Sequence, residues 1–148
     1  MSNQVIDWLE SQQNNMLDLL GELVNIDSNS FDKAGVDRVA DQLAEFFDAH
    51  SIPHETIPIT THGDAMRAVV AGGNGNRPIL LCGHRDTVFP KGEVAKRPFR
   101  IKNGRAYGPG VADMKPGLVI NAFILAAFQK FGGHPNPLVG LFTGDEEI

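Results

Sequence analysis

Three stretches of the chain have the apolar patterning of helices. Within residues 36–47 the apolar positions recur at intervals of three and four, which predicts a helix with one buried face. Residues 5–25 are rich in Leu, Val and Ile and contain no proline, so we expect a helix there too. A third helix is predicted in "KPGLVINAFILAAFQKFGG", where Pro116 suits the first helical position and Gly132 or Gly133 suits the C-terminal cap.

Short apolar runs elsewhere in the chain predict strands. "PILLC" (78–82) and "PLVGLFT" (137–143) are nearly all apolar, as strands covered on both faces are. "SIPHETIPI" (51–59) and "AMRAVVAGG" (65–73) are also expected to be extended, and the prolines of the first favour an edge of the sheet. "NG" at 103–104 predicts a hairpin turn within "FRIKNGRAYG".

The order strand, helix, strand at 78–82, 116–131 and 138–143 predicts a parallel pair of strands joined by a crossover helix. We therefore expect an α/β fold with a mixed, largely parallel sheet and helices on both faces. Parallel strands end at the same edge of their sheet, and the helix between them starts at that edge. Ligands bind at this edge in open α/β sheets.

Four residues suited to acid–base or metal chemistry fall at this predicted edge. His84 directly follows the first strand, Asp113 precedes the crossover helix, and Glu146 and Glu147 follow the second strand. Carboxylates that converge in this way repel one another unless a cation neutralises them. Imidazole together with carboxylate oxygens suits zinc, and less selectively manganese or cobalt. Asp86 is close enough in sequence to reach the far nitrogen of His84, as partners of metal-binding histidines do.

Each of these motifs taken alone has a plainer interpretation. An H-x-D sequence is usually a polar turn, and the acidic run at 145–147 is usually a solvated loop. "GPGVAD" resembles a glycine-rich phosphate loop, but Asp113 would place a negative charge where a phosphate should sit. The single cysteine, Cys82, excludes an internal disulfide and is expected to be buried in its apolar run. The remaining histidines are expected at the surface or in turns: His50, His54, His62 and His134.

Length and composition limit the classes of protein to consider. The chain has 148 residues, 42% of them hydrophobic and 21% charged, as is normal for one globular domain. A net charge of −5 gives no electrostatic case for binding nucleic acid or an anionic membrane. No apolar run approaches the roughly 20 residues of a membrane span. Asp7 and Glu10 fall where a signal peptide would be apolar, so we expect a cytoplasmic location.

The three motifs together resemble a known family. "GHRDTVFPKG", "AYGPGVADMKPG" and "TGDEEI" are similar to the N-terminal signatures of the zinc-dependent peptidases and deacylases that include glutamate carboxypeptidase, acetylornithine deacetylase, succinyl-diaminopimelate desuccinylase and aminoacylase. The resemblance runs from about Leu19 to the end of the chain and is strongest to the glutamate carboxypeptidase-like branch. It implies a zinc-dependent metallopeptidase or amidohydrolase that cleaves an amide bond in a small peptide or an N-acyl amino acid.

The resemblance also implies a role for each site residue. His84 would bind one zinc ion and Glu147 a second, while Asp113 would bridge both ions. Asp86 would orient His84, and Glu146 would be the general base that activates water. The peptide bond after Asp113 would be cis. The complete enzyme would hold two zinc ions, or cobalt or manganese in their place.

The chain departs from the family in three respects. Arg85 stands where methionine is common and adds a cation beside the site, and Pro116 stands where glycine or alanine is frequent. Family members are more than twice as long, and they supply another acidic ligand, a histidine near the C-terminus and a second small domain often used for dimerisation. Residues 1–148 are therefore expected to be the N-terminal portion of a catalytic domain, without the lid or dimerisation domain and the C-terminal portion, and to be inactive alone.

Three functional hypotheses follow from these observations. In the first, the chain is the N-terminal part of a metal-dependent hydrolase acting on small peptides or N-acyl amino acids, and the full-length protein could form a homodimer. In the second, it is a truncated, non-catalytic binding or assembly module derived from that family, because each zinc would lack a protein ligand. In the third, it is a nucleotide-binding domain.

Overall fold

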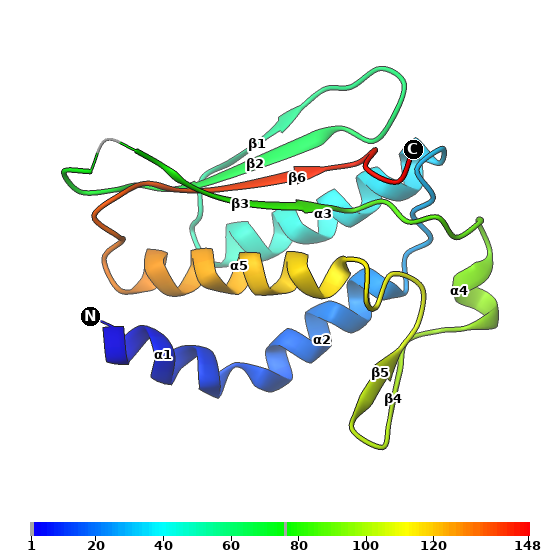
Figure 1. Ribbon diagram of the computed structural model, residues 1–148, viewed down its shortest axis with the longest axis horizontal. Helices are drawn as coiled ribbons and strands as arrows, with labels where there is room; N and C mark the ends of the chain where they lie inside the picture. Colours follow the sequence, from blue (N-terminus) through cyan, green and yellow to red (C-terminus); the bar gives the residue numbers. More distant parts are fainter. Residues whose placement is uncertain (1, 76) are drawn as a thin grey trace.

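The computed structural model describes residues 2–75 and 77–148. Its elements, in chain order, are α1 (Ser2–Ser11), α2 (Gln13–Val24), α3 (Lys33–Ala49), β1 (His54–Ile57), β2 (Ala65–Val70), β3 (Ile79–His84), α4 (Glu93–Lys96), β4 (Arg100–Lys102), β5 (Arg105–Tyr107), α5 (Lys115–Lys130) and β6 (Leu138–Thr143). Helices α3 and α5 lie against one face of a four-stranded sheet, and α1 and α2 lie on the outer side of α5 (Figure 1). The hairpin of β4 and β5 projects from this body (Figure 1).

The strand order of the sheet is β1-β2-β6-β3. β6 lies parallel to β3, with partners that run from Ile79 opposite Leu138 to His84 opposite Thr143. Helix α5 lies between these two strands in the chain, so the predicted parallel pair with its crossover helix is confirmed. β6 also pairs antiparallel with β2, and β2 pairs antiparallel with β1. The mixed α/β class is confirmed as well.

The expected sheet differs from the observed one in two details. Two of its three strand pairings are antiparallel, so the sheet is not largely parallel. Within the described residues, the helices cover only one face of it (Figure 1). Leu80 is 52% exposed and Cys82 is also exposed, so the burial predicted for 78–82 and for Cys82 is wrong. β3 is the edge strand, and an apolar run does not reveal whether a second layer covers it.

Local signals mark the ends of two helices. α3 begins after Asp32, whose side chain accepts a hydrogen bond from the backbone N–H of Gly35 at 3.3 Å. α5 begins at Lys115 and has Pro116 in its first turn. Gly132 follows the end of α5 with a φ of 89°, a left-handed conformation that glycine adopts without strain. Both caps are therefore decided by residues next to the helix itself.

The remaining elements show one success and one error of the sequence analysis. Asn103 and Gly104 connect β4 to β5 with φ values of 53° and 70°, which is the backbone of a tight two-residue hairpin. The single helix expected at 5–25 is instead two helices that meet at Gln12. Among the described residues, none of the helices has the length and apolar character that crossing a membrane requires.

The hydrophobic core lies between the sheet and helices α3 and α5. The rings of Phe47 on α3 and Phe142 on β6 lie 5.8 Å apart. A Cβ added to Gly140 of β6 would come within 2.9 Å of Leu125 on α5, so glycine allows this helix to approach the strand closely. The core residues include Leu23, Val39, Leu43, Phe47, Met66, Ala68, Leu118, Ala122, Leu125 and Phe142. This packing holds the start of α5 beside the ends of β3 and β6.

A buried lysine connects α5 to the end of α2. Lys115 is fully buried, and its Nζ donates hydrogen bonds of 2.8 Å to the backbone carbonyls of Leu23 and Ile26. Burial lowers the pKa of Lys115 to about 8, although the Asp27 carboxylate opposes this shift. The side chain of Lys115 thereby satisfies carbonyl groups at the end of α2, where a helix leaves its last carbonyls without intrahelical partners.

Replacing Lys115 with methionine is expected to change how stability depends on pH. In the unfolded chain the lysine titrates near 10.5, so between pH 8 and 10.5 the unfolded state binds more protons than the folded state. The stability of the unmodified protein should therefore rise relative to the variant across this range, by at most about 3 kcal/mol. Urea denaturation of both proteins at several pH values measures the difference.

Lys102→Met is the control for this experiment, because Lys102 is exposed on β4. Its stability should stay within about 0.5 kcal/mol of that of the unmodified protein, because substitutions at exposed positions have small effects. A flat difference for Lys115→Met as well would contradict the burial of a titrating amine.

Candidate metal centre

Two parallel strands and one helix deliver the candidate site residues to a common edge. His84 is the last residue of β3, and Glu146 and Glu147 follow Thr143, the last residue of β6. Asp113 lies two residues before the first residue of α5, and its peptide bond to Met114 is cis, as the resemblance implied. The edge predicted from the order of the elements is therefore where these residues lie.

The side chains converge on the Nε2 atom of His84. Its Nε2 lies 3.1 Å from Oδ1 of Asp113 and 3.8 Å from Oε2 of Glu146. His84 is only 5% exposed, whereas the Asp113 side chain is 75% exposed and faces solvent. One ligand atom from each of His84, Asp113 and Glu147 lies within 4.8 Å of the others, so the three could hold a metal ion together.

Asp86 is the buried centre of the hydrogen bonding around this cluster. Its carboxylate accepts hydrogen bonds from the backbone N–H groups of Glu146 at 3.2 Å and Glu147 at 3.1 Å. It also accepts one from the hydroxyl of Ser30 at 2.6 Å. Nδ1 of His84 lies 3.3 Å from the same carboxylate and 3.1 Å from the Asp86 carbonyl. These contacts hold Nδ1 and leave Nε2 to face the acidic side chains.

The predicted contact between Asp86 and His84 is thus present, but Asp86 does more than sequence reasoning foresaw. Its link to the backbone of the two glutamates, and the contribution of Ser30, were not predicted. No sequence signal marks Ser30, because it lies 56 residues from Asp86 and serines are common in loops.

The electrostatics of the two buried groups follow from these contacts. Burial alone would raise the pKa of Asp86, but hydrogen bonds from Ser30 and from the backbone of Glu147 and Glu146 outweigh it and lower the pKa. Burial alone would lower the pKa of His84, but the Asp113, Asp86 and Glu146 carboxylates outweigh it and raise the pKa. Asp86 is therefore anionic at neutral pH, and His84 is surrounded by negative charge.

Arg85 does not point into the acidic cluster. It is fully buried, and it donates hydrogen bonds to the backbone carbonyls of Val36 on α3 at 3.2 Å and Thr143 on β6 at 3.3 Å. Burial lowers its pKa to about 10, opposed by nearby carboxylates that include Asp37 and Asp64. The cation that the sequence places beside the site therefore ties the end of β6 to the start of α3.

The glycine-rich stretch before Asp113 packs closely against the end of β3. Gly110 has a φ of 73°, and a Cβ at this position would come within 2.8 Å of Thr87 and 3.2 Å of Lys115. Glycine is therefore required at position 110, where the backbone packs against the side chains of Thr87 and Lys115. This packing explains the glycine-rich "GPGVAD" motif without a bound phosphate.

Two pockets border the cluster. The first has a volume of about 290 Å³ and is lined by Asp113 and Glu147 together with apolar residues that include Val88 and Phe89. The second, of about 240 Å³, is lined by His84 and Glu146 together with Met114, Leu141 and other residues. A small molecule in either pocket would contact residues of the cluster.

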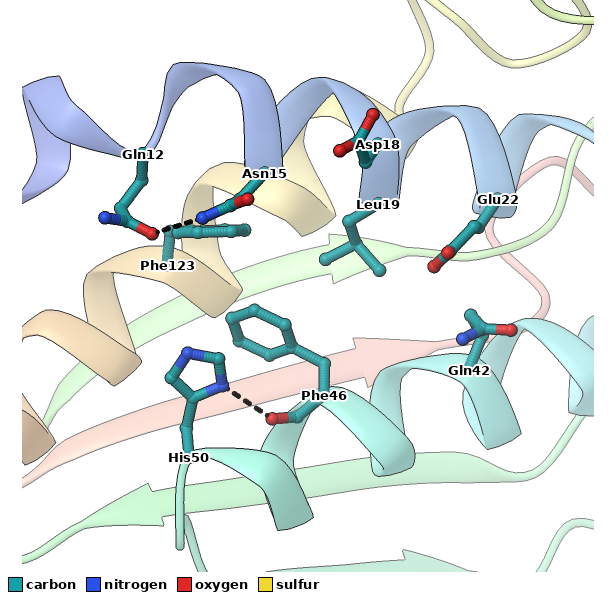
Figure 2. A pocket seen from close by; sticks show the side chains of 9 residues that line it. All are labelled: Gln12, Asn15, Asp18, Leu19, Glu22, Gln42, Phe46, His50 and Phe123. Carbon is teal, nitrogen blue, oxygen red and sulfur yellow. Dashed lines mark hydrogen bonds between the residues drawn. The ribbon is translucent and has the colours of Figure 1, made fainter.

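A third pocket, of about 250 Å³, lies between the helices and contains none of the cluster residues (Figure 2). His50 lines it, with Nδ1 2.9 Å from the carbonyl oxygen of Phe46 and the two rings stacked 4.2 Å apart. The other histidines outside the cluster are also partly exposed, and the described residues place none of them in a metal-binding group.

Comparisons with known proteins indicate the same family as the three sequence motifs. The family model "Peptidase family M20/M25/M40" matches residues 80–148. Carboxypeptidase G2 of Pseudomonas sp. (strain RS-16) is 30% identical over 98% of this chain and 35% of its own length. Acetylornithine deacetylase of Proteus mirabilis (strain HI4320) is 34% identical over 71% of this chain and 28% of its own length.

Solved structures show the same fold. Human carnosine dipeptidase 1 superposes with a TM-score of 0.80 at 16% identity, over 97% of this chain and 34% of that protein. An M20 family metallo-carboxypeptidase from Sulfolobus solfataricus superposes with a TM-score of 0.73 at 20% identity, over 88% of this chain and 31% of that protein. The chain thus spans about a third of the length of these relatives. The segment that the family model matches contains His84, Asp113 and Glu147. The chain belongs to peptidase family M20/M25/M40.

Proposed function

We propose that residues 1–148 are the N-terminal part of the catalytic domain of a metal-dependent hydrolase that cleaves amide bonds in small peptides or N-acyl amino acids. The observation that carries this proposal is the convergence of one ligand atom each from His84, Asp113 and Glu147 within 4.8 Å. The names of the relatives, a carboxypeptidase and an acetylornithine deacetylase, support this class of substrate. The proposal includes a cytoplasmic location and, for the full-length protein, a homodimer.

The charges at the site favour a bound cation. Carboxylates of Asp113 and Glu146 lie within 4 Å of Nε2 of a single imidazole, and Glu147 lies beside them. Like charges this close raise one another's energy unless a positive ion lies among them. An imidazole nitrogen and carboxylate oxygens form a donor set that zinc accepts, and cobalt and manganese accept it less selectively.

Each residue of the site would have a defined role. His84 and Glu147 would each hold one of two zinc ions, and Asp113 would be shared between the ions, since its carboxylate has an oxygen within 4.8 Å of a ligand atom of each of the other two residues. Bound zinc would polarise the substrate carbonyl and lower the pKa of a water molecule. Glu146, whose side chain is 62% exposed, would accept a proton from the attacking water and pass it to the leaving nitrogen. Asp86 would hold His84 with Nε2 facing the metal.

Isothermal titration of the chain with Zn²⁺ tests the metal site. Asp113→Asn should weaken zinc binding at least about tenfold, because the variant removes a charged ligand while keeping its volume. Asp145→Asn is the matched control, since Asp145 is an exposed acidic residue of the same edge that lies outside the cluster. Its affinity for zinc should equal that of the unmodified chain.

Two results would contradict this proposal. One is an unmodified chain that does not bind zinc, cobalt or manganese. The other is equal loss of affinity in both variants, which would indicate general attraction to acidic residues and not a defined site. For the full-length protein, chelation is expected to abolish hydrolysis of N-acyl amino acids and added zinc to restore it.

A further inference from the structure

A short segment between α2 and α3 contacts two of the three segments around the candidate metal ligands, namely the residues after β3 and the start of α5. The backbone N–H of Thr87 donates to the carbonyl of Ser28 at 2.8 Å, and the side chain of Asn29 donates to the carbonyl of Val88 at 3.3 Å. Lys115, two residues after Asp113, donates to the carbonyl of Ile26 at 2.8 Å. This segment, residues 25–30, lies outside the part of the chain that the family model matches.

One side chain of the 25–30 segment reaches the centre of the site directly. Ser30 is only 2% exposed, and its hydroxyl donates to Oδ2 of Asp86 at 2.6 Å. The same Oδ2 accepts the backbone N–H of Glu147 at 3.1 Å, while Oδ1 accepts that of Glu146 at 3.2 Å. A hydroxyl has a single proton to donate, so Ser30 gives it to Asp86.

We propose that Ser30 is a positioning residue of this site, which orients the Asp86 carboxylate so that it holds the backbone of Glu146 and Glu147. The importance of this role for metal binding rests on the function proposed above. The structural part, which concerns the backbone of the two glutamates, does not depend on a bound metal.

The geometry explains why one hydroxyl has this effect. A carboxylate that accepts a hydrogen bond on each oxygen can still rotate or tilt if the donors are on a loop that moves with it. Ser30 lies on a different part of the fold, between α2 and α3, and its short bond ties Oδ2 to that part. Hydrogen bonds to an ionised acceptor are stronger than those between neutral groups, so this anchor is effective. Without the hydrogen bond from Ser30, the Asp86 carboxylate that contacts both glutamates and the His84 ring would be held less firmly.

A neighbouring serine provides the control for a purely structural role. Ser28 is 1% exposed, and among the described residues its hydroxyl has no hydrogen-bond partner. Ser28→Ala and Ser30→Ala thus remove the same atom from equally buried positions of one segment. They differ in that only Ser30 contacts Asp86.

The test compares Ser30→Ala, Ser28→Ala and Ser30→Thr in the chain of 148 residues. Without metal, amide resonances of Glu146 and Glu147 in ¹⁵N NMR spectra should shift in Ser30→Ala and stay in place in Ser28→Ala. With metal, Ser30→Ala should weaken zinc binding by about tenfold and alter the visible absorption of bound Co²⁺. Ser30→Thr keeps the hydroxyl and should restore both properties.

The proposal is overturned if Ser30→Ala and Ser28→Ala leave these amide resonances equally unchanged, or if they weaken zinc binding equally. If the unmodified chain does not bind metal, the proposed function fails, whereas the amide resonances still decide the role of Ser30. If Ser30→Ala does not fold, Ser30→Cys replaces it, because a thiol is similar in size and a weak donor. The same shift of the two amides is then expected.

Discussion

Replacing Asp86 with alanine is expected to weaken zinc binding about 100-fold and to lower the free energy of unfolding by about 3 kcal/mol. The carboxylate is fully buried and accepts hydrogen bonds from Ser30, Glu146 and Glu147. Its removal leaves these donors without their acceptor and releases Nδ1 of His84, 3.3 Å away. Loss of both the ligand orientation and the buried bonds explains why metal affinity and stability should fall together.

The pH dependence of this difference gives a second measurement. Hydrogen bonds lower the pKa of Asp86 in the folded protein below its ordinary value of 3.8. A carboxyl group of this kind stabilises the fold above its unfolded pKa, and the stabilisation is lost as the pH falls through the folded value. The stability gap between the unmodified protein and Asp86→Ala should therefore shrink at pH values below about 4, whereas between pH 7 and 5 it should widen as the pH falls, because Asp86 also raises the pKa of His84.

Asp145→Ala is the control for Asp86→Ala, since Asp145 is exposed at the same edge of the sheet. Calorimetric titration with zinc and urea denaturation of both variants check the prediction. If Asp86→Ala retained the zinc affinity of the unmodified chain, the buried carboxylate would have no part in holding the cluster.

Replacing Arg85 with methionine is expected to lower the free energy of unfolding by about 2 to 3 kcal/mol. The guanidinium is fully buried and donates to the carbonyls of Val36 and Thr143. It is also the buried cation among carboxylates that include Asp37 and Asp64. Methionine keeps much of the apolar stem but removes both side-chain hydrogen bonds and the positive charge near these carboxylates, and hydrogen bonds from a charged donor contribute about 1.5 to 3 kcal/mol each.

Arg38→Met is the matched control, because Arg38 is exposed on α3, close in sequence to the residues that Arg85 contacts. Its stability should stay within about 0.5 kcal/mol of the unmodified protein. Urea denaturation at neutral pH measures both variants. A change of similar size in the two proteins would show that Arg85 does not join β6 to α3 as its hydrogen bonds indicate.

Elements with a local signal could be predicted from the sequence. The apolar spacing of 36–47 identified α3, because it depends on residues that are neighbours in the chain. The order of strand, helix and strand also placed His84 and Asp113 at one edge, since parallel strands must end together. The convergence of the candidate site thus followed from chain order, without knowledge of any distance.

Sequence-based predictions were wrong where the burial or direction of a side chain depends on distant parts of the molecule. The exposure of Leu80 and Cys82 is decided by whether another layer covers the outer face of β3, and an apolar run cannot report this. The break at Gln12 between α1 and α2 was missed because neither glycine nor proline marks it in the sequence. The sequence also placed Arg85 beside the site, whereas its side chain turns to α3.

The sequence by itself determined that the candidate site residues lie at one edge of the sheet, because the order of the elements along the chain places them at the ends of two parallel strands and the start of the helix between them. Only the tertiary structure decided what supports them. Ser30 and Asp86 are 56 residues apart, and a lone serine has no pattern that predicts its partner. Their contact exists because packing of α2, α3 and α5 against the sheet brings the 25–30 segment to the edge where β3 and β6 end.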